Sequence, residues 1–234
     1  MVALLELKSE VWTLRIILDC DPGHDDAFAI LLAAASEEIE LLGVTTVAGN
    51  SYLENTTLNA RKVLDLFDLD VPVFPGCARP LFRNVVVAPQ IHGQSGLDGA
   101  TVPPPKRGIQ KTHAVDFIAE VARKYEDLIL VPTGPLTNVA LFMLRYPELV
   151  KRISMIVLMG GGIAFGNVTP VAEFNIFADP GLGSTYYVDL LKALRSGAST
   201  EQISDMIKTA VEKKPLVHHM RDTQIDNEMY KLGG

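Results

Sequence analysis

The sequence has few cysteines, no excess of positive charge and no long apolar run, and each shortage excludes a class of protein. Cys20 and Cys77 are its only cysteines and form no CxxC pair, so we expect neither a disulfide scaffold nor a zinc site. The formal net charge of −7 argues against a surface for nucleic acid or anionic membranes. No stretch reaches the ~18 consecutive apolar residues of a membrane span.

The lack of a basic leader and the small number of cysteines indicate the cellular compartment. Residues 1–8 carry no basic leader, and Glu6 interrupts their apolar run, so we expect no signal peptide. Two distant cysteines fit a reducing environment, and we therefore expect a cytoplasmic protein. What the chain does have is 48% apolar residues over a length of 234, enough for the core of a single α/β domain.

Four aspartates crowd the end of the first apolar segment, around a Pro22-Gly23 turn. They are Asp19, Asp21, Asp25 and Asp26, and a helical pattern with dense apolar residues at 27–32 follows them. This order predicts a strand, a tight turn and a helix whose positive dipole end stabilises part of the negative charge. Carboxylates this close repel one another unless a cation lies among them, and oxygen-only ligands suit calcium or magnesium.

Apolar segments and helical patterns then alternate up to residue 180. Further strands are expected at 40–48, 71–74, 128–131 and 153–159, and helices at 55–67, 112–125 (capped by Thr112) and 139–144. The alternation predicts an α/β fold with an open, mostly parallel sheet flanked by helices and a Rossmann-like core. Residues 169–179 are expected to be extended, which places Glu173 and Asn175 on one face.

The chain is expected to divide into a domain at 1–180 and a helical tail at 181–234. The tail contains helical patterns at 184–194 and 200–211, with Ser199 and Gln202 as a capping box. Packing on the same domain is its simplest role, and contact with a second copy in a homo-oligomer is the alternative.

Polar residues fall just beyond the expected strands. The aspartate loop, Asn50, Thr133 and Met159 all occupy such positions, and in open α/β sheets ligands bind outside the carboxyl ends of the strands. The glycine-rich and proline-rich stretch 76–111, which carries His92, is long enough to be a functional loop or lid. The pattern therefore predicts one convergent site.

Each of these residues also has a plainer interpretation. The acidic loop could be a solvated, helix-capping turn, or an Asp-x-Asp phosphatase loop, although Pro22-Gly23 replaces the Thr or Val such a loop wants. His92 could be a surface histidine, Asn50 a turn residue, and Glu173 and Asn175 part of an exposed edge strand. Met159 is a residue type more often found in the core.

Six ordered motifs resemble the inosine-uridine preferring nucleoside hydrolase family. They are Asp19-x-Asp21-Pro-Gly-x-Asp25-Asp26, Ala48-Gly49-Asn50, His92-Gly93, Thr133-Gly-Pro-Leu-Thr-Asn138, Met159-Gly-Gly-Gly162 and Asn167 through Glu173-Phe-Asn175 to Asp179-Pro180. The resemblance covers residues 14–180. Cys20, His24 and the segment 95–99 are most similar to members that prefer pyrimidine ribonucleosides.

The resemblance implies a role for each of the matched residues. A calcium ion would be held by Asp21, Asp26 and the main-chain carbonyl of Thr133, with Asp21 also the general base. Asp19 would orient the turn, and His92 would lie beside the site as a second catalytic candidate. The substrate, a small-molecule ribonucleoside cleaved at its N-glycosidic bond, would be bound by Asp25, Asn50, Met159, Asn167, Glu173 and Asn175.

The family pattern also includes a late His-Asp motif that supplies a further calcium ligand. Residues 181–234 do not continue this pattern, and His218-His219-Met-Arg-Asp222 carries both residue types at a different spacing. The alternative to an active hydrolase is therefore a relative that retains a calcium and ribose pocket without efficient catalysis, or that serves as a binding or structural subunit.

Overall fold

The computed structural model describes residues 13–81, 83–180, 199, 201–202 and 205. Within these residues the strands are β1 Leu14–Cys20, β2 Ile39–Thr46, β3 Val73–Pro75, β4 Leu128–Pro132 and β5 Ile153–Ile156. The helices are α1 His24–Ala35, α2 Leu53–Leu66, α3 Pro89–His92, α4 Ala114–Lys124, α5 Thr137–Arg145 and α6 Phe174–Ala178, with a 3₁₀ helix at Pro147–Arg152.

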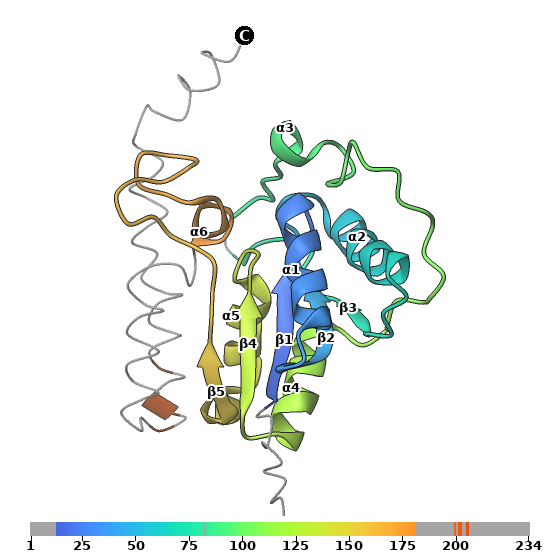
Figure 1. The fold of residues 1–234 in the computed structure, drawn as a ribbon. Helices are drawn as coiled ribbons and strands as arrows, with labels where there is room; N and C mark the ends of the chain where they lie inside the picture. Colours follow the sequence, from blue (N-terminus) through green and yellow to red (C-terminus); the bar gives the residue numbers. More distant parts are fainter. Residues whose placement is uncertain (1–12, 82, 181–198, 200, 203–204, 206–234) are drawn as a thin grey trace, which may run out of the picture.

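The strands form a parallel sheet in the order β3-β2-β1-β4-β5 (Figure 1). The chain therefore builds outward from β1 through β2 to β3, and then continues on the other side of β1 through β4 to β5. The strand order reverses between β1 and β4, and this switch point opens a crevice at their carboxyl ends. The α/β class with a mostly parallel, helix-flanked sheet is confirmed.

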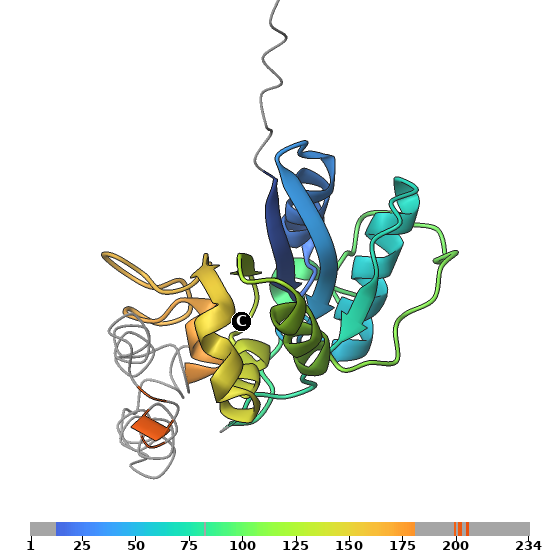
Figure 2. The same ribbon diagram turned by 90° about the horizontal axis from the view of Figure 1, so that it is seen from below.

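Helices cover both faces of the sheet (Figures 1 and 2). Successive residues of a strand point to opposite faces, so Ile17 packs with Phe142 of α5, while Leu18 packs with Ile30 of α1 and Leu64 of α2. All five side chains are almost completely buried. The two apolar layers hold β1 from both sides, which fixes the direction in which the aspartate loop leaves the strand.

The segment expected to be extended at 169–179 contains a short helix, α6, and that prediction is wrong. The Glu173 carboxylate caps this helix by accepting hydrogen bonds from the main-chain N–H groups of Asn175 and Ile176. A local cap of this kind satisfies helix N–H groups that a strand would offer to a neighbour. Glu173 and Asn175 therefore do not share a strand face, and both are buried.

Other boundaries also shift. The fifth strand ends at Ile156 and not at Met159, although the N–H of Met159 still donates to the Pro132 carbonyl. Helix α4 is capped by His113, whose Nδ1 accepts from Val115 N–H at 3.3 Å, and not by Thr112. On α1, Phe28 is 75% exposed, so the apolar residues after the aspartate loop do not all face the core.

The tail beyond residue 180 lies almost wholly outside the described residues, including the expected helix at 184–194 and the 218–222 segment; of the expected helix at 200–211 only 201, 202 and 205 are described, and they are helical. Ser199 and Gln202 are described, and they make the reciprocal hydrogen bonds of the expected capping box at 2.8 and 3.2 Å. The division at 180 and the role of the tail stay predictions. In the part of the chain that is described, none of the helices has the length and apolar character needed to cross a bilayer.

Candidate active site

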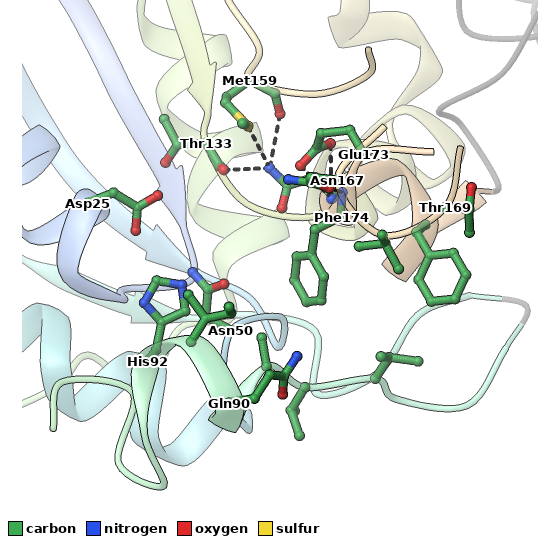
Figure 3. A pocket seen from close by; sticks show the side chains of 17 residues that line it. Asp25, Asn50, Gln90, His92, Thr133, Met159, Asn167, Thr169, Glu173 and Phe174 are labelled. Carbon is green, nitrogen blue, oxygen red and sulfur yellow. Dashed lines mark hydrogen bonds between the residues drawn. The ribbon is translucent and has the colours of Figure 1, made fainter. Parts of the chain in front are cut away.

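A cavity of about 600 Å³ opens beyond the carboxyl ends of β1, β2 and β4. Figure 3 shows Asp25, Asn50 and His92 on one side of it and Met159, Asn167, Glu173 and Phe174 on the other. Eight residues selected from the sequence line it: Asp25, Asn50, His92, Thr133, Met159, Asn167, Glu173 and Asn175. The structure thus brings together side chains that are up to 150 positions apart in the chain.

Asp21 and Asp26 do not line the cavity but lie buried next to it. The Pro22-Gly23 turn folds the start of α1 back toward β1, so that the Asp26 carboxylate accepts from Asp21 N–H at 3.1 Å. The Asp21 carboxylate accepts from Asn50 N–H at 2.6 Å, and the Asn50 amide donates to the Asp21 carbonyl at 3.1 Å. Asn50 therefore joins the ends of β1 and β2, and is more than a turn residue.

Asp19 lies one layer deeper, at the end of β1. Its Oδ1 accepts hydrogen bonds from Thr45 Oγ1 at 2.6 Å and Asn138 Nδ2 at 2.7 Å, and its carbonyl accepts from Thr133 N–H at 2.8 Å. These bonds tie β1 to β2, β4 and α5. Its Oδ2 has no partner among the described residues, and the implied role of Asp19 in orienting the turn stays a prediction.

The buried carboxylates carry an unbalanced negative charge. Burial, followed by the charge of Asp26, raises the pKa of Asp21 well above its usual value. Burial is also the main cause that raises the pKa of Asp26, and it raises the pKa of Asp19 to about 6. In the described part of the chain neither Asp21 nor Asp26 forms an ion pair with Lys or Arg.

This charge and the close packing around Asp21 fit a small cation. A side chain at Gly49 would bring its Cβ within 2.0 Å of Asp21 Oδ2, and one at Gly134 within 2.7 Å of Oδ1. The two glycines therefore leave room for the Asp21 carboxylate, and carboxylate oxygens are the ligand type that calcium takes. Among the described residues no group of three or more His, Cys, Asp or Glu side chains lies close enough together to hold a metal ion, and the calcium ligands stay a prediction.

Thr133, Met159 and Asn175 form the wall opposite Asn50. The Asn175 amide donates to the Thr133 carbonyl at 2.7 Å, to the Met159 carbonyl at 3.0 Å and to the Met159 sulfur at 3.2 Å (Figure 3). The amide therefore holds the chain after β4 beside the chain after β5. Met159 is 49% exposed at the cavity and is not a core residue.

Glu173 and Asn167 complete this wall. The Glu173 carboxylate accepts from Gly161 N–H at 3.1 Å in addition to capping α6, and Asn167 Oδ1 accepts from Phe174 N–H at 2.8 Å. Gly161 has φ of +78°, a conformation that favours glycine, so the glycine run serves this turn. The hydrogen bonds from Gly161 and from α6 therefore hold the Glu173 carboxylate in place at the cavity.

The loop 76–111 forms the remaining wall and is attached to the domain at several points. Ala88 N–H donates to the Asn50 carbonyl at 3.1 Å, Asn59 Nδ2 donates to the Ser95 carbonyl at 2.8 Å, and Gln110 N–H donates to the Val73 carbonyl at 2.9 Å. His92, at the end of α3, is half-buried at the cavity and is not a free surface histidine.

Sequence reasoning missed further, mostly apolar lining residues from this loop, from positions 168–169 and from α6. These residues are Val86, Val87, Ala88, Gln90, Ile91, Val168, Thr169, Phe174 and Phe177. The consecutive apolar residues at 85–88 were the available signal, because such a run is unusual in a loop rich in glycine and proline. The cavity thus has a polar end near Asp25 and Asn50 and a more apolar wall.

The geometry excludes two of the plainer interpretations given in the sequence analysis. Asp19, Asp21 and Asp26 are each at most 3% exposed, so the loop is not a solvated acidic turn, although Asp25 is exposed at the cavity. Glu173 and Asn175 do not belong to an exposed edge strand. The roles given to the individual site residues remain predictions.

Comparison with known proteins gives consistent results. The family model for "Inosine-uridine preferring nucleoside hydrolase" matches residues 16–181. The chain is 49% identical over 167 residues to the "Pyrimidine-specific ribonucleoside hydrolase RihB" of Escherichia coli K12 and of Escherichia fergusonii, covering 71% of this chain and 53% of each relative. The chain therefore spans about half the length of the curated relatives it matches.

Solved structures show the same similarity. A "Purine-Preferring Ribonucleoside Hydrolase from Gardnerella vaginalis" aligns with a TM-score of 0.69 at 32% identity, over 86% of this chain and 74% of that one. A "Plant nucleoside hydrolase - PpNRh1 enzyme" aligns with a TM-score of 0.67 at 33% identity, over 71% and 54%. An "Inosine-Guanosine Nucleoside Hydrolase" aligns at 0.68 and 34%, over 76% and 56%.

Proposed function

The chain belongs to the inosine-uridine preferring nucleoside hydrolase family, and from this premise we propose that its cavity binds a ribonucleoside and hydrolyses the N-glycosidic bond. The products would be ribose and the free base, and a pyrimidine is the preferred base by similarity to the relatives named pyrimidine-specific. The observation that carries the proposal is the convergence of Asp25, Asn50 and Glu173 on one cavity beside the buried Asp21–Asp26 pair.

The polar end of the cavity suits a sugar with several hydroxyl groups. Carboxylates accept hydrogen bonds from hydroxyls, and side-chain amides both donate and accept. Asp25, Asn50, Asn167, Glu173 and Asn175 supply both kinds of group. A site built to pair with each hydroxyl binds an analogue lacking one of them much less well.

The charge of the cavity suits the reaction. As the bond between the anomeric carbon and the base nitrogen breaks, positive charge develops on the ribose, and the carboxylates of Asp25 and Glu173 stabilise it. The bonding electrons leave with the base, which takes up a proton, while a water oxygen forms the new bond to the anomeric carbon. Met159 and His92 also line the cavity, His92 from the loop 76–111.

Asp21 is the group proposed to accept the proton of the attacking water. Burial raises its pKa, which makes the carboxylate a stronger base than an exposed aspartate. Asp21, Asp26 and the Thr133 carbonyl are the groups that would hold a calcium ion. When bound, that ion supplies a Lewis acid that lowers the pKa of a water molecule.

The test combines calorimetric titration with calcium and an assay of uracil release from uridine. We expect calcium binding and hydrolysis in the unaltered protein, and loss of both in Asp21→Asn. Asp70→Asn is the matched control, because the Asp70 side chain is 94% exposed and does not line the cavity. Hydrolysis that persists in Asp21→Asn contradicts the assigned base. Calcium and uridine binding without hydrolysis would instead favour the alternative of a catalytically impaired relative.

A further inference from the structure

His24 touches the site without lining it. It precedes Asp25 at the first position of α1, while His92 ends α3 on the loop opposite. The two rings stack with centroids 5.5 Å apart and planes 25° apart. Neither the proposed chemistry nor the cavity lining uses His24, so its contact with His92 has no role in the site as described so far.

Both ring nitrogens of His24 have partners. Nδ1 lies 3.3 Å from Nδ1 of His92, and Nε2 lies 2.9 Å from the main-chain carbonyl oxygen of Asp98. A carbonyl oxygen only accepts hydrogen bonds, so the proton of a neutral His24 is on Nε2. The Nδ1 of His24 is then bare and can only accept. With His24 neutral in this form, a hydrogen bond between the rings is donated by Nδ1 of His92.

The Asp98 carbonyl is a well-held acceptor. The Asp98 carboxylate accepts from the N–H groups of Gln94 and Ser95 at 2.8 and 3.1 Å, and Asp98 N–H donates to the His92 carbonyl at 3.2 Å. The turn 92–98 is thus closed on itself, and Gly93 at φ +77° lets the chain reverse there. His24 binds both ends of this turn, the ring at 92 and the carbonyl at 98.

We propose that His24 is a positioning residue that sets the tautomer of His92, with the proton on Nδ1 and Nε2 left bare. Nδ1 is occupied by His24, so Nε2 is the ring nitrogen that remains for a ligand. A bare Nε2 accepts a hydrogen bond from a hydroxyl or water and donates none. Resting on the proposed function, this makes neutral His92 an acceptor toward the ribonucleoside and not a donor to the departing base.

Other proton arrangements satisfy the same distances, and they share a bare Nδ1 on His92. The main-chain N–H of His24 lies 3.4 Å from that nitrogen and donates to it only if it is bare. His24 then either carries protons on both ring nitrogens or faces His92 with its own Nδ1 bare, and in both cases neutral His92 carries its proton on Nε2. These arrangements and the proposed one predict opposite tautomers for His92, so a single measurement separates them.

The measurement is a long-range proton–nitrogen correlation spectrum of the histidine rings in the ¹⁵N-labelled full chain, recorded above the pH at which the rings become neutral. We expect the pattern of an Nδ1-protonated ring for His92, assigned by its loss in His92→Gln. His113 is an internal control, because its Nδ1 accepts from Val115 N–H and its proton must lie on Nε2. An Nε2-protonated His92 in the unaltered protein overturns the proposal.

Two variants test whether His24 is the cause. His24→Phe keeps a flat ring but removes the acceptor, and we expect the His92 signal to move toward the Nε2-protonated form while His113 is unchanged. His24→Gln keeps a side-chain carbonyl that can accept from Nδ1, and we expect it to restore the original pattern. An unchanged His92 signal in His24→Phe contradicts the assignment.

The kinetic consequence is tested separately on uridine. In His24→Phe we expect kcat to fall about tenfold with a smaller change in KM, and His24→Gln to recover most of the loss. Equal kcat in all three proteins contradicts the positioning role. If the unaltered chain hydrolyses no ribonucleoside, the proposed function fails, whereas the tautomer spectrum still decides the inference about His24.

Discussion

The side-chain amide of Asn175 donates a 2.7 Å hydrogen bond to the main-chain carbonyl of Thr133. Thr133 follows β4 and Asn175 belongs to α6, so this bond sets the width of the cavity between them. A carbonyl oxygen has two lone pairs, so accepting from Asn175 leaves one available to a cation. The proposed calcium ligand is thus held in place by a proposed sugar ligand.

Asn175→Ala should weaken both stability and ligand binding. It leaves the Thr133 and Met159 carbonyls without their donor, and an unsatisfied buried polar group costs about 1–3 kcal/mol. Urea denaturation measures the stability, and calorimetry with uridine measures the binding. Asn84→Ala, at an exposed position, should change neither. Unaltered uridine affinity in Asn175→Ala would argue against its place in the sugar site.

Gly49→Ala should disrupt the aspartate pair. Its Cβ would lie 2.0 Å from Asp21 Oδ2, nearer than any side chain tolerates, and Asp21 would have to move. We expect calcium affinity, measured by calorimetry, to fall at least about tenfold. Gly108→Ala is the matched control, because a Cβ there meets nothing within 4 Å. Equal calcium affinity in the two variants would show that Asp21 is not a ligand.

Asp19 should make the metal-free protein lose stability as pH rises. Burial raises the pKa of its folded form to about 6 from an ordinary value of 3.8, so the folded state holds the proton more tightly. This contribution is complete below pH 3.8 and is lost as pH rises to about 6, a change on the order of 3 kcal/mol. Asp19→Asn removes the titrating group and keeps an oxygen for Thr45 and Asn138.

The test is chemical denaturation in the presence of a chelator at several pH values between 4 and 7. The free energy of unfolding of the unaltered protein, relative to that of Asp19→Asn, should decrease over this interval. A constant difference between the two proteins would mean that Asp19 has the same pKa in the folded and unfolded states.

Arg61 and Asp65 should contribute strongly to stability away from the site. Arg61 and Asp65 lie 2.9 Å apart with side chains only 2% and 4% exposed, and Arg61 also donates to the carbonyls of Leu69 and Val71. Arg61→Met removes one partner of a buried pair, and we expect a loss of about 3 kcal/mol in urea denaturation.

The control for this change is Arg145→Met. Its ion pair with Asp116 is 3.4 Å long, and the Arg145 side chain is 55% exposed. We expect a loss of under about 1 kcal/mol there, as for other surface pairs. Similar losses in the two variants would mean that burial does not set the strength of the Arg61–Asp65 pair.

Local sequence patterns were sufficient to predict a helix, strand or turn wherever its periodicity or turn residues lie within one segment. The alternation of buried strands and amphipathic helices predicted the parallel sheet, and the turn at Pro22-Gly23 predicted the crowding of Asp21 and Asp26. Period two failed at 173–175, because a run of a few residues does not distinguish a strand from a capped turn of helix. At this position the Glu173 carboxylate favours the helix, because it accepts a hydrogen bond from the main-chain N–H of Asn175 in α6.

The sequence by itself determined the order of elements and which polar residues follow the strands, because side-chain periodicity and turn residues are local properties. Only the tertiary structure decided which of those residues meet. His24 reaches His92 across 68 positions and Asn175 reaches Thr133 across 42, and no local pattern encodes such a contact. The packing of helices on both faces of β1 brings these segments to one edge of the sheet, and that packing makes separate motifs into a single cavity.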